Sequence, residues 1–225
     1  MEENGIDTEG QEYPSAQAFW EAELSGEGPS AWYSKALKYW DQQEPTYNGV
    51  LAGYGHLSRI DLIDSAAFLK RVFAQLFKER RHEGATTRSV DCGAGVGRVS
   101  EHVLLHAFDE VDLLEPSKPL LEEARQRLAV PKAGEPLGKA TKFICTGLQD
   151  FEPEARRYDC IWLQWVILCI TDDGVVNALT RCKDGLRDGG YIIVRARVHV
   201  CIFCPENAVV CIAPILRAFL ATCQL

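Results

Sequence analysis

A glycine-rich turn after a short apolar run carries the clearest chemical signal in this sequence. Positions 89–98 read Ser-Val-Asp-Cys-Gly-Ala-Gly-Val-Gly-Arg. A turn of this kind, between a buried strand and a helix, brings backbone close to a nucleotide-like ligand. The dinucleotide fingerprint G-x-G-x-x-G/A is not met, because Arg98 stands in the third glycine slot after Gly93 and Gly95. Asp91 would repel a pyrophosphate and attract an ammonium. The turn therefore favours S-adenosylmethionine, which has an ammonium, a sulfonium and no phosphate, over NAD.

Further side chains suited to binding such a ligand follow the carboxyl ends of other predicted strands. Glu115 ends the second strand about 20 residues after the glycine turn, where such folds hold ribose hydroxyls. Leu148 and Gln149 follow the third strand, where Leu148 would pack on an adenine ring and Gln149 would bond its edge. Gln164 and Trp165 end the fourth strand. Gln164 suits the amino-acid end of the ligand and Trp165 a wall of the methyl-accepting pocket, with a core position for Trp165 as the alternative.

An alternation of strands and helices must bring these positions together. The sequence predicts strands at 88–92, 110–114, 141–145, 158–164 and 190–197, and helices at 97–107, 117–129 and 173–187. This alternation predicts an α/β fold with parallel strands, right-handed crossovers and a ligand at the carboxyl ends of the strands.

The chain before this domain is predicted to be mainly helical. Residues 1–30 are expected to form a flexible segment with one short helix near 15–24. Residues 31–84 contain a helix at 31–42, a glycine-interrupted stretch at 49–56, and a long helix capped by Ser58 or Asp61 and ending near Arg81. The aromatic stripe of the 31–42 helix favours packing over binding. Composition leaves open whether 49–56 is a lid or a plain connector.

Composition excludes several classes of partner. The 225 residues carry a net charge of −8 without a Lys/Arg block, so no nucleic acid is expected, and no membrane span is expected because no uncharged apolar stretch is long enough. The nine cysteines lie mostly in apolar runs and no secretory signal precedes them, which favours a reduced, cytoplasmic setting, with the nucleus as a second compartment. Cys201 and Cys204 form an isolated Cys-x-x-Cys, so we expect no metal.

Several strings, in order and at similar spacing from about residue 31 to about 194, resemble the protein α-N-terminal methyltransferases, plant members in particular. They are Tyr39-Trp40, Gly53-Tyr-Gly-His56, Asp91-Cys-Gly-Ala-Gly-Val-Gly-Arg98, Gly147-Leu-Gln-Asp-Phe151, Tyr158-Asp159, Ile161-Trp-Leu-Gln-Trp-Val-Ile167 and Thr171-Asp172. The resemblance implies a Rossmann-like class I S-adenosylmethionine-dependent fold. It also implies methylation of the N-terminal amine of Xaa-Pro-Lys/Arg proteins. The residues that it assigns to the cofactor are Trp40, Gly93, Arg98, Glu115, Leu148 and Gln164. Tyr39 and Trp165 would form the channel for the substrate N-terminus, the 49–56 loop would cover that channel, and Arg98 would bond the methionine carboxylate.

The sequence departs from the family pattern in three places. Cys169 occupies the position of a family His that assists with the substrate proton, so the catalytic residue is unknown. The fifth strand continues into Arg195-Ala196-Arg197, where the family has an acid and a substrate-binding Asn. The tail, residues 198–225, resembles nothing in the family, so the last two strands are expected to be missing. The fifth strand would then be an apolar edge, which the 208–225 segment would cover or expose to aggregation.

The sequence therefore predicts a methyltransferase domain at 85–197, preceded by the helical extension and followed by a divergent tail. We expect a truncated or alternatively spliced form of an N-terminal protein methyltransferase. The first alternative is a catalytically impaired form that acts as a cofactor-binding or regulatory protein. A small-molecule methyltransferase fits the cofactor residues equally well, and an NAD enzyme fits them least.

Overall fold

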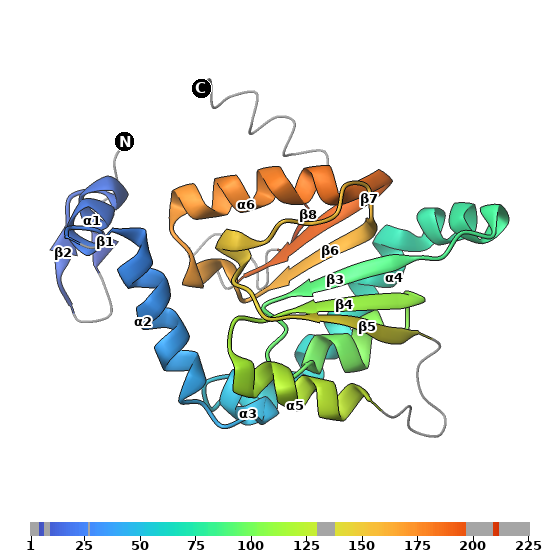
Figure 1. The fold of residues 1–225 in the computed structure, drawn as a ribbon, viewed down its shortest axis with the longest axis horizontal. Helices are drawn as coiled ribbons and strands as arrows, with labels where there is room; N and C mark the ends of the chain where they lie inside the picture. The colour runs from blue at the N-terminus through green and yellow to red at the C-terminus, as the bar shows by residue number, and fades with distance from the viewer. Residues whose placement is uncertain (1–4, 7–9, 27, 130–137, 197–208, 212–225) are drawn as a thin grey trace.

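The computed structural model describes residues 5–6, 10–26, 28–129, 138–196 and 209–211. Its centre is a six-stranded sheet in the order β5-β4-β3-β6-β7-β8 (Figure 1). The five parallel strands are β3 (Arg88–Cys92), β4 (Glu110–Leu114), β5 (Lys139–Ile144), β6 (Tyr158–Gln164) and β7 (Leu186–Arg195). From β3 the chain continues to β4 and β5 on one side and later to β6 and β7 on the other. The connections that leave β3 and β6 therefore run in opposite directions, and a crevice is expected between them at the carboxyl ends of these strands. The predicted Rossmann-like α/β fold is confirmed.

Strand residues alternate between the two faces of the sheet, as the period of two requires. On β6, Cys160 and Trp162 are fully buried on one face and Ile161 and Leu163 on the other. The β6 strand is buried along its whole length, because helices cover both faces of the parallel sheet.

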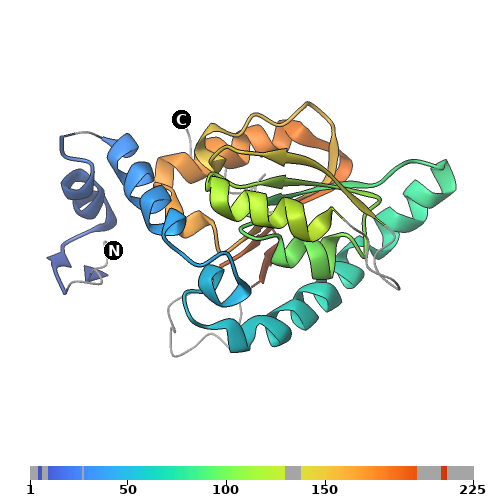
Figure 2. The ribbon, with the colours of Figure 1, turned by 60° about the horizontal axis from the view of Figure 1, so that its bottom comes forward.

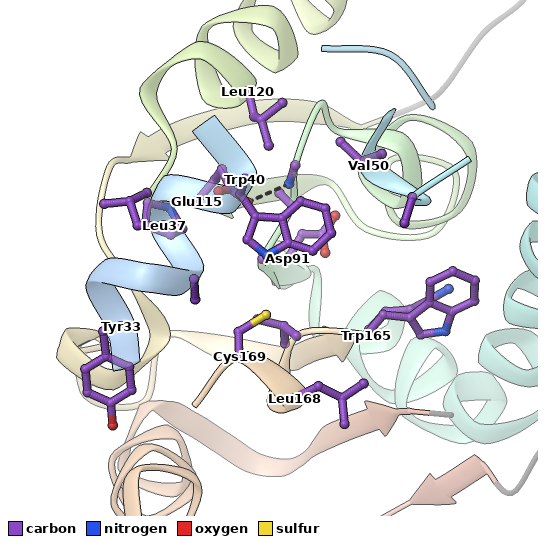
Figure 3. A pocket seen from close by; sticks show the side chains of 18 of the residues that line it. Tyr33, Leu37, Trp40, Val50, Asp91, Glu115, Leu120, Trp165, Leu168 and Cys169 are labelled. Atoms are coloured by element: carbon purple, nitrogen blue, oxygen red, sulfur yellow. Dashed lines mark hydrogen bonds between the residues drawn. The ribbon is translucent and has the colours of Figure 1, made fainter. Parts of the chain in front are cut away.

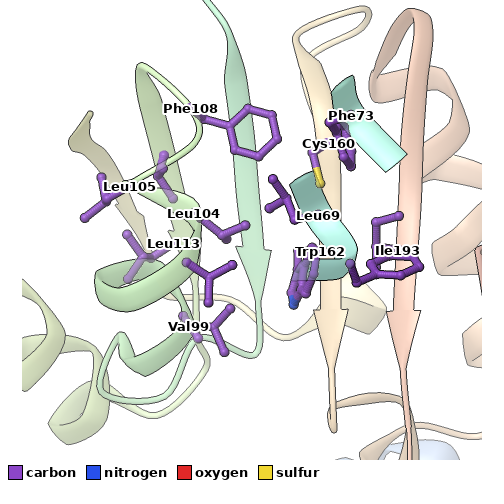
Figure 4. Packing of buried hydrophobic residues seen from close by; sticks show 14 of the residues in the cluster. Leu69, Phe73, Val99, Leu104, Leu105, Phe108, Leu113, Cys160, Trp162 and Ile193 are labelled. Carbon is purple, nitrogen blue, oxygen red and sulfur yellow. The ribbon is translucent and has the colours of Figure 1, made fainter. Parts of the chain in front are cut away.

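Two helices and a helical turn cover the first face. They are α4 (Ser58–Glu83), α5 (Lys118–Leu128) and the segment η2 (Ser100–Leu104). Figure 4 shows Leu69 and Phe73 of α4 over Trp162 and Cys160, while Phe108 lies beside them. The predicted helix at 97–107 is correct in place, but residues 100–104 have π-helical rather than α-helical hydrogen bonding.

One long helix, α6 (Asp172–Gly185), covers the opposite face together with two short turns. Thr171 caps α6, since its Oγ1 accepts a hydrogen bond of 3.1 Å from the Gly174 amide. The turns η3 (Leu148–Asp150) and η4 (Ile167–Cys169) follow β5 and β6 at the carboxyl edge. Because these turns lie at the ends of the strands, those of their side chains that point away from the core, such as Gln149 and Leu168, are available to a ligand.

The N-terminal region has more regular structure than predicted. The pair β1 (Gly5–Ile6) and β2 (Glu12–Tyr13) is antiparallel and precedes α1 (Ala16–Glu23). Edge-to-face contacts of Phe19 with Tyr13 (5.2 Å between centroids) and Trp20 with Trp32 (5.1 Å) stabilise this unit. Aromatic contacts therefore pack part of this segment against α2 (Pro29–Asp41), and its flexibility stays a prediction.

The stretch between α2 and α4 crosses the carboxyl edge of the sheet (Figure 2). It forms α3 (Tyr47–Val50) and the turn η1 (Gly55–Leu57). Gly49 is required here, because a Cβ would lie 2.0 Å from the Glu44 carbonyl oxygen, and a Cβ on Gly55 would displace the Asn48 side chain, whose Oδ1 would lie 2.8 Å away.

The divergent tail supplies one strand. β8 (Val209–Cys211) pairs antiparallel with residues 193–195 of β7, so part of the tail covers the edge that the sequence predicted to be open. Cys201 and Cys204 lie outside the described residues. Within the described part of the chain, no three His, Cys, Asp or Glu side chains gather as a metal site. No helix in that part is long and apolar enough to cross a bilayer.

Candidate active site

A cavity of about 640 Å³ lies at the carboxyl edge of the sheet, over the ends of β3, β4 and β6 (Figure 3). This volume is in the range of small-molecule and cofactor sites, roughly 300–1,000 Å³. The glycine turn forms its floor. Side chains of α2, the α3 region and η4 form its walls, with Trp40, Val50 and Cys169 facing one another across the space. The predicted glycine turn and the ends of strands two and four are thus brought together.

The glycine turn has a backbone that only glycine adopts without strain. Gly93, Gly95 and Gly97 have φ values of 73°, 56° and 81°. A Cβ on Gly93 would lie 2.6 Å from Val166 Cγ2, and one on Gly95 would lie 3.2 Å from Val50 Cγ1. The missing side chains therefore leave room for the approach of η4 and of the α3 region.

Glu115 joins the tip of β4 to the glycine turn. Its side chain is buried, and its two oxygens accept hydrogen bonds of 2.9 Å from the amides of Gly95 and Ser117 (Figure 3). Burial raises the pKa of Glu115 to about 7, although the two amide donors oppose this shift. Hydroxyl donors from a ligand would stabilise the ionised form further, which is the chemistry of a ribose diol against a carboxylate.

Asp91 supplies a buried acid on the floor of the cavity. Its Oδ2 accepts hydrogen bonds from the amide (3.1 Å) and the hydroxyl (2.7 Å) of Ser100. Among the described residues, no hydrogen bond reaches the other oxygen. Burial raises the pKa of Asp91 to about 6, while the Ser100 bonds and the charge of Arg98 lower it. A carboxylate that lacks its full set of donors fits the ammonium of a bound amino acid.

Arg98 and Gln164 lie together at the end of the cavity next to α4. Arg98 Nη1 is 2.8 Å from Asp61 Oδ2, and Gln164 Nε2 donates to the same oxygen at 2.6 Å. The guanidinium carbon of Arg98 is 5.8 Å from the ring centre of Trp165. The sequence alone indicates only a possible helix cap for Asp61. The structure corrects this, because Asp61 lies within the first turn of α4 and its carboxylate binds side chains from β6 and the glycine turn.

The turn after β6 forms a wall of the cavity beside the glycine turn, against which Val166 packs at Gly93. Trp165 has a left-handed backbone (φ 61°), and its amide donates to the Arg195 carbonyl oxygen at 2.8 Å. A bulky residue in this conformation is uncommon and marks a functional or strained position. Leu168 and Cys169 of η4 complete the wall, and Leu168 is 61% exposed. Burial raises the pKa of the Cys169 thiol, and a hydrogen bond with Trp40 opposes this.

Two predicted site residues lie elsewhere. Tyr39 is 48% exposed and does not line the cavity. Tyr39 contacts Trp40 edge-on at 5.1 Å between ring centroids, and its predicted role in the substrate channel stays a prediction. Leu148 is buried in the core against α6, because the η3 turn directs it inward and leaves Gln149 at the cavity.

The family resemblance predicts Trp40 of helix α2 and the 49–56 stretch at the site, and both segments line the cavity. Trp32 Nε1 donates to the Cys169 carbonyl oxygen at 3.2 Å, and the hydroxyls of Tyr33 and Thr171 are 3.0 Å apart. On the other side, the Tyr47 hydroxyl donates to Glu101 at 2.5 Å, and burial raises the pKa of Tyr47. The 49–56 stretch is therefore a wall of the cavity and not a plain connector.

Comparisons with known proteins agree with this geometry. A family profile described as AdoMet dependent proline di-methyltransferase matches residues 28–225. This chain belongs to that family. Alpha N-terminal protein methyltransferase 1 of Arabidopsis thaliana is 40% identical over 85% of this chain and 70% of its own length. N-terminal Xaa-Pro-Lys N-methyltransferase 1 of the mouse is 41% identical over 75% of this chain and 72% of its own. A SAM-dependent methyltransferase structure from Leishmania major is 36% identical, covers 86% of this chain and 73% of its own, and superposes with a TM-score of 0.72.

The cofactor of this methyltransferase is S-adenosylmethionine, as its family description states. The cavity fits that group. Glu115 suits the ribose, Asp91 the ammonium and Arg98 the carboxylate, while Trp40 and Leu37 offer apolar surface beside them. The assignment of each of these residues to a part of the cofactor stays a prediction.

Proposed function

We propose that this methyltransferase modifies the α-amino group of proteins whose N-terminus reads Xaa-Pro-Lys or Xaa-Pro-Arg. The observation that supports this most is the family match together with about 40% identity, over 70% or more of their length, to relatives named for that activity. The cavity is consistent with it, because an open end beside Trp165 and Leu168 gives a peptide terminus access to the cofactor site.

The residues of the chain have distinct tasks in this proposal. When bound, the cofactor supplies a methyl group on a sulfonium, which an amine lone pair displaces in line. Asp91, Arg98 and Glu115 orient the cofactor by charged hydrogen bonds. Trp165 and Leu168 present an apolar surface that excludes water from the acceptor amine and fits a small N-terminal residue followed by proline.

The acceptor amine must lose a proton, and among the described residues the wall beside the predicted acceptor position, formed by Trp165, Leu168 and Cys169, carries no side chain that is a base at neutral pH. An α-amine has a pKa near 8. Cys169, at the family His position, has a raised thiol pKa and stays protonated at neutral pH. We therefore propose that the amine reacts in the neutral form it reaches in solution. The rate should then rise with pH through about 8 and level off above it, as the pH dependence of kcat/KM would show.

Mass spectrometry of an Ala-Pro-Lys peptide, incubated with the purified protein and S-adenosylmethionine, tests the proposal. We expect a gain of one or more methyl groups confined to the α-amine. The same peptide with an acetylated N-terminus is the matched control and should gain none. Absence of methylation beside an active full-length relative would contradict the proposal. It would favour the alternative of an impaired cofactor-binding form, to which Cys169 and Arg195 at their family positions point.

Proteins with such N-termini are the proposed partners. The cytoplasmic and nuclear location and the lack of a nucleic-acid partner stay predictions. They are checked by fluorescence microscopy of the tagged chain and by electrophoretic mobility shift.

A further inference from the structure

A network of charged side chains connects four separate elements behind the amino-acid end of the cavity. Asp61 and Asp64 come from α4, Arg98 from the turn after β3, Gln164 from β6 and Arg195 from β7. Asp61 Oδ2 binds Arg98 Nη1 and Gln164 Nε2 at 2.8 and 2.6 Å, and Asp61 Oδ1 lies 3.8 Å from Arg195 Nη2. One carboxylate therefore contacts three partners from three different strand ends.

Burial distinguishes Asp61 from its neighbour on the helix. The side chains of Asp61, Arg98 and Arg195 are 10%, 6% and 8% exposed, whereas that of Asp64 is 52% exposed. Asp64 binds Arg195 alone, at 2.6 Å. The Arg98–Asp61 pair is thus largely shielded from water, where truncating one partner of a charged pair has a large effect.

The geometry of Arg98 indicates what Asp61 does. Arg98 Nη1 forms the ion pair with Asp61 and also donates a hydrogen bond of 3.5 Å to Ser58 Oγ. Among the described residues, no hydrogen bond is made by its Nε or Nη2, and the side chain lines the cavity. A guanidinium that is held through one nitrogen has its other N–H donors available to a ligand carboxylate. Gln164 is held similarly, because its Oε1 accepts from Trp162 Nε1 at 2.9 Å while one amide proton points to Asp61.

We propose that Asp61 is a positioning residue for the amino-acid end of the cofactor and acts through Arg98 and Gln164. Asp61 fixes the donor edge of Arg98 and the amide of Gln164 before the ligand arrives, so the ligand does not lose affinity in ordering them. The inference rests on the cofactor part of the proposed function, and the protein substrate does not enter it.

Removal of Asp61 would also have an effect that favours ligand binding. Asp61 neutralises part of the charge of Arg98, and its removal would strengthen the attraction between Arg98 and a ligand carboxylate. Three donors converge on Asp61, however, and without its charge they lose their common anchor. Arg195 keeps its partner Asp64 at 2.6 Å, but Arg98 loses the carboxylate that holds it at 2.8 Å, and we expect misplacement of Arg98 to dominate.

The test compares two ligands that differ only at the relevant end. S-adenosylhomocysteine carries the amino acid, and 5′-methylthioadenosine has the same nucleoside without it. For Asp61→Asn we expect the Kd of S-adenosylhomocysteine to rise about tenfold by titration calorimetry, as for the loss of one charge-assisted hydrogen bond. The Kd of 5′-methylthioadenosine should stay within about twofold. Asp64→Asn, the matched control on the same helix, should leave both unchanged to about the same margin.

Asp61→Glu keeps the charge and moves it by one methylene. It replaces Asp61→Asn in the test if circular dichroism shows that the Asn variant does not fold. It should weaken S-adenosylhomocysteine less than Asn does and leave 5′-methylthioadenosine unchanged. Equal weakening of both ligands would overturn the proposal in favour of a general structural role. Unchanged or tighter S-adenosylhomocysteine binding would overturn it in favour of competition for Arg98. Wild-type protein that binds S-adenosylhomocysteine but does not methylate peptides would refute the proposed substrate and leave this inference testable.

Discussion

Substitution of Glu115 by glutamine should change how the stability of the cofactor-free protein depends on pH. Glu115 has a pKa of about 7 in the folded chain, raised from 4.5 by burial. Below pH 4.5 the carboxyl is protonated in both states. Between 4.5 and 7 the unfolded chain releases this proton and the folded chain retains it, so the free energy of unfolding falls as pH rises. At about 1.4 kcal/mol per pKa unit, the loss is about 3 kcal/mol by pH 8.

Glu115→Gln removes this titration and keeps the shape of the side chain. The glutamine amide would meet the Ser117 N–H, a donor facing a donor, which costs about 1–3 kcal/mol at every pH and shifts the curve without changing its slope. Urea unfolding at intervals from pH 4.5 to 8 should therefore show the wild-type advantage over the variant shrinking by about 3 kcal/mol. Glu152→Gln, at a side chain that is 84% exposed, is the control and should run parallel to the wild type. A constant difference between wild type and Glu115→Gln would refute the burial argument.

Three further changes test the site. Glu115→Ala should weaken S-adenosylmethionine binding by about 1–3 kcal/mol through lost charged hydrogen bonds, and unchanged affinity in calorimetry would remove Glu115 from the site. Gly93→Ala should destabilise the fold by clearly more than Gly189→Ala in thermal unfolding. Both glycines have φ near 75°, but only the Gly93 Cβ would meet Val166 at 2.6 Å, and equal losses would mean that η4 yields freely. Cys169→His, alone and with a family C-terminal segment grafted on, should raise kcat/KM and add a pH inflection near 6.5, and no gain in a folded chimera would place the catalytic defect elsewhere.

The sequence predicted the sheet well because its signals are local. Buried runs such as 158–164 and the glycines at 93, 95 and 97 carry their structural meaning within a few residues. The start of β7 was predicted four residues late, because a register shift opposite Tyr158 and Cys160 lets the strand begin at Leu186. The π-turn at 100–104 gave no local signal, and its start at Ser100 is bonded to Asp91 at the end of the preceding strand.

The site was predicted less completely, because side-chain direction depends on packing between distant elements. Glu115, Gln164 and Trp165 were predicted at the site because they end strands, and all three line the cavity. A strand-end position did not distinguish Leu148 from Gln149, since the turn that buries one and exposes the other forms only against α6. The sequence does place Asp61 shortly after the glycine-rich 49–56 stretch, which is a weak signal for the site. Its partners Arg98 and Gln164, however, lie 37 and 103 residues away. No periodicity connects residues so far apart.

The attachment of α2 has a consequence for the rate at which ligands exchange. No residue of this helix is buried, although Trp40 forms a wall of the cavity. Long-range hydrogen bonds of Trp32 with the Cys169 carbonyl, of Tyr33 with Thr171 and of Trp40 with the Cys169 thiol hold it to the opposite side of the site. Bonds of this kind contribute about 0.5–1.5 kcal/mol each, far less than separating the core helices from the sheet. Helix α2 is therefore easier to displace than the core helices, and the residence time of a bound nucleoside should depend on how often this helix moves away from the cavity.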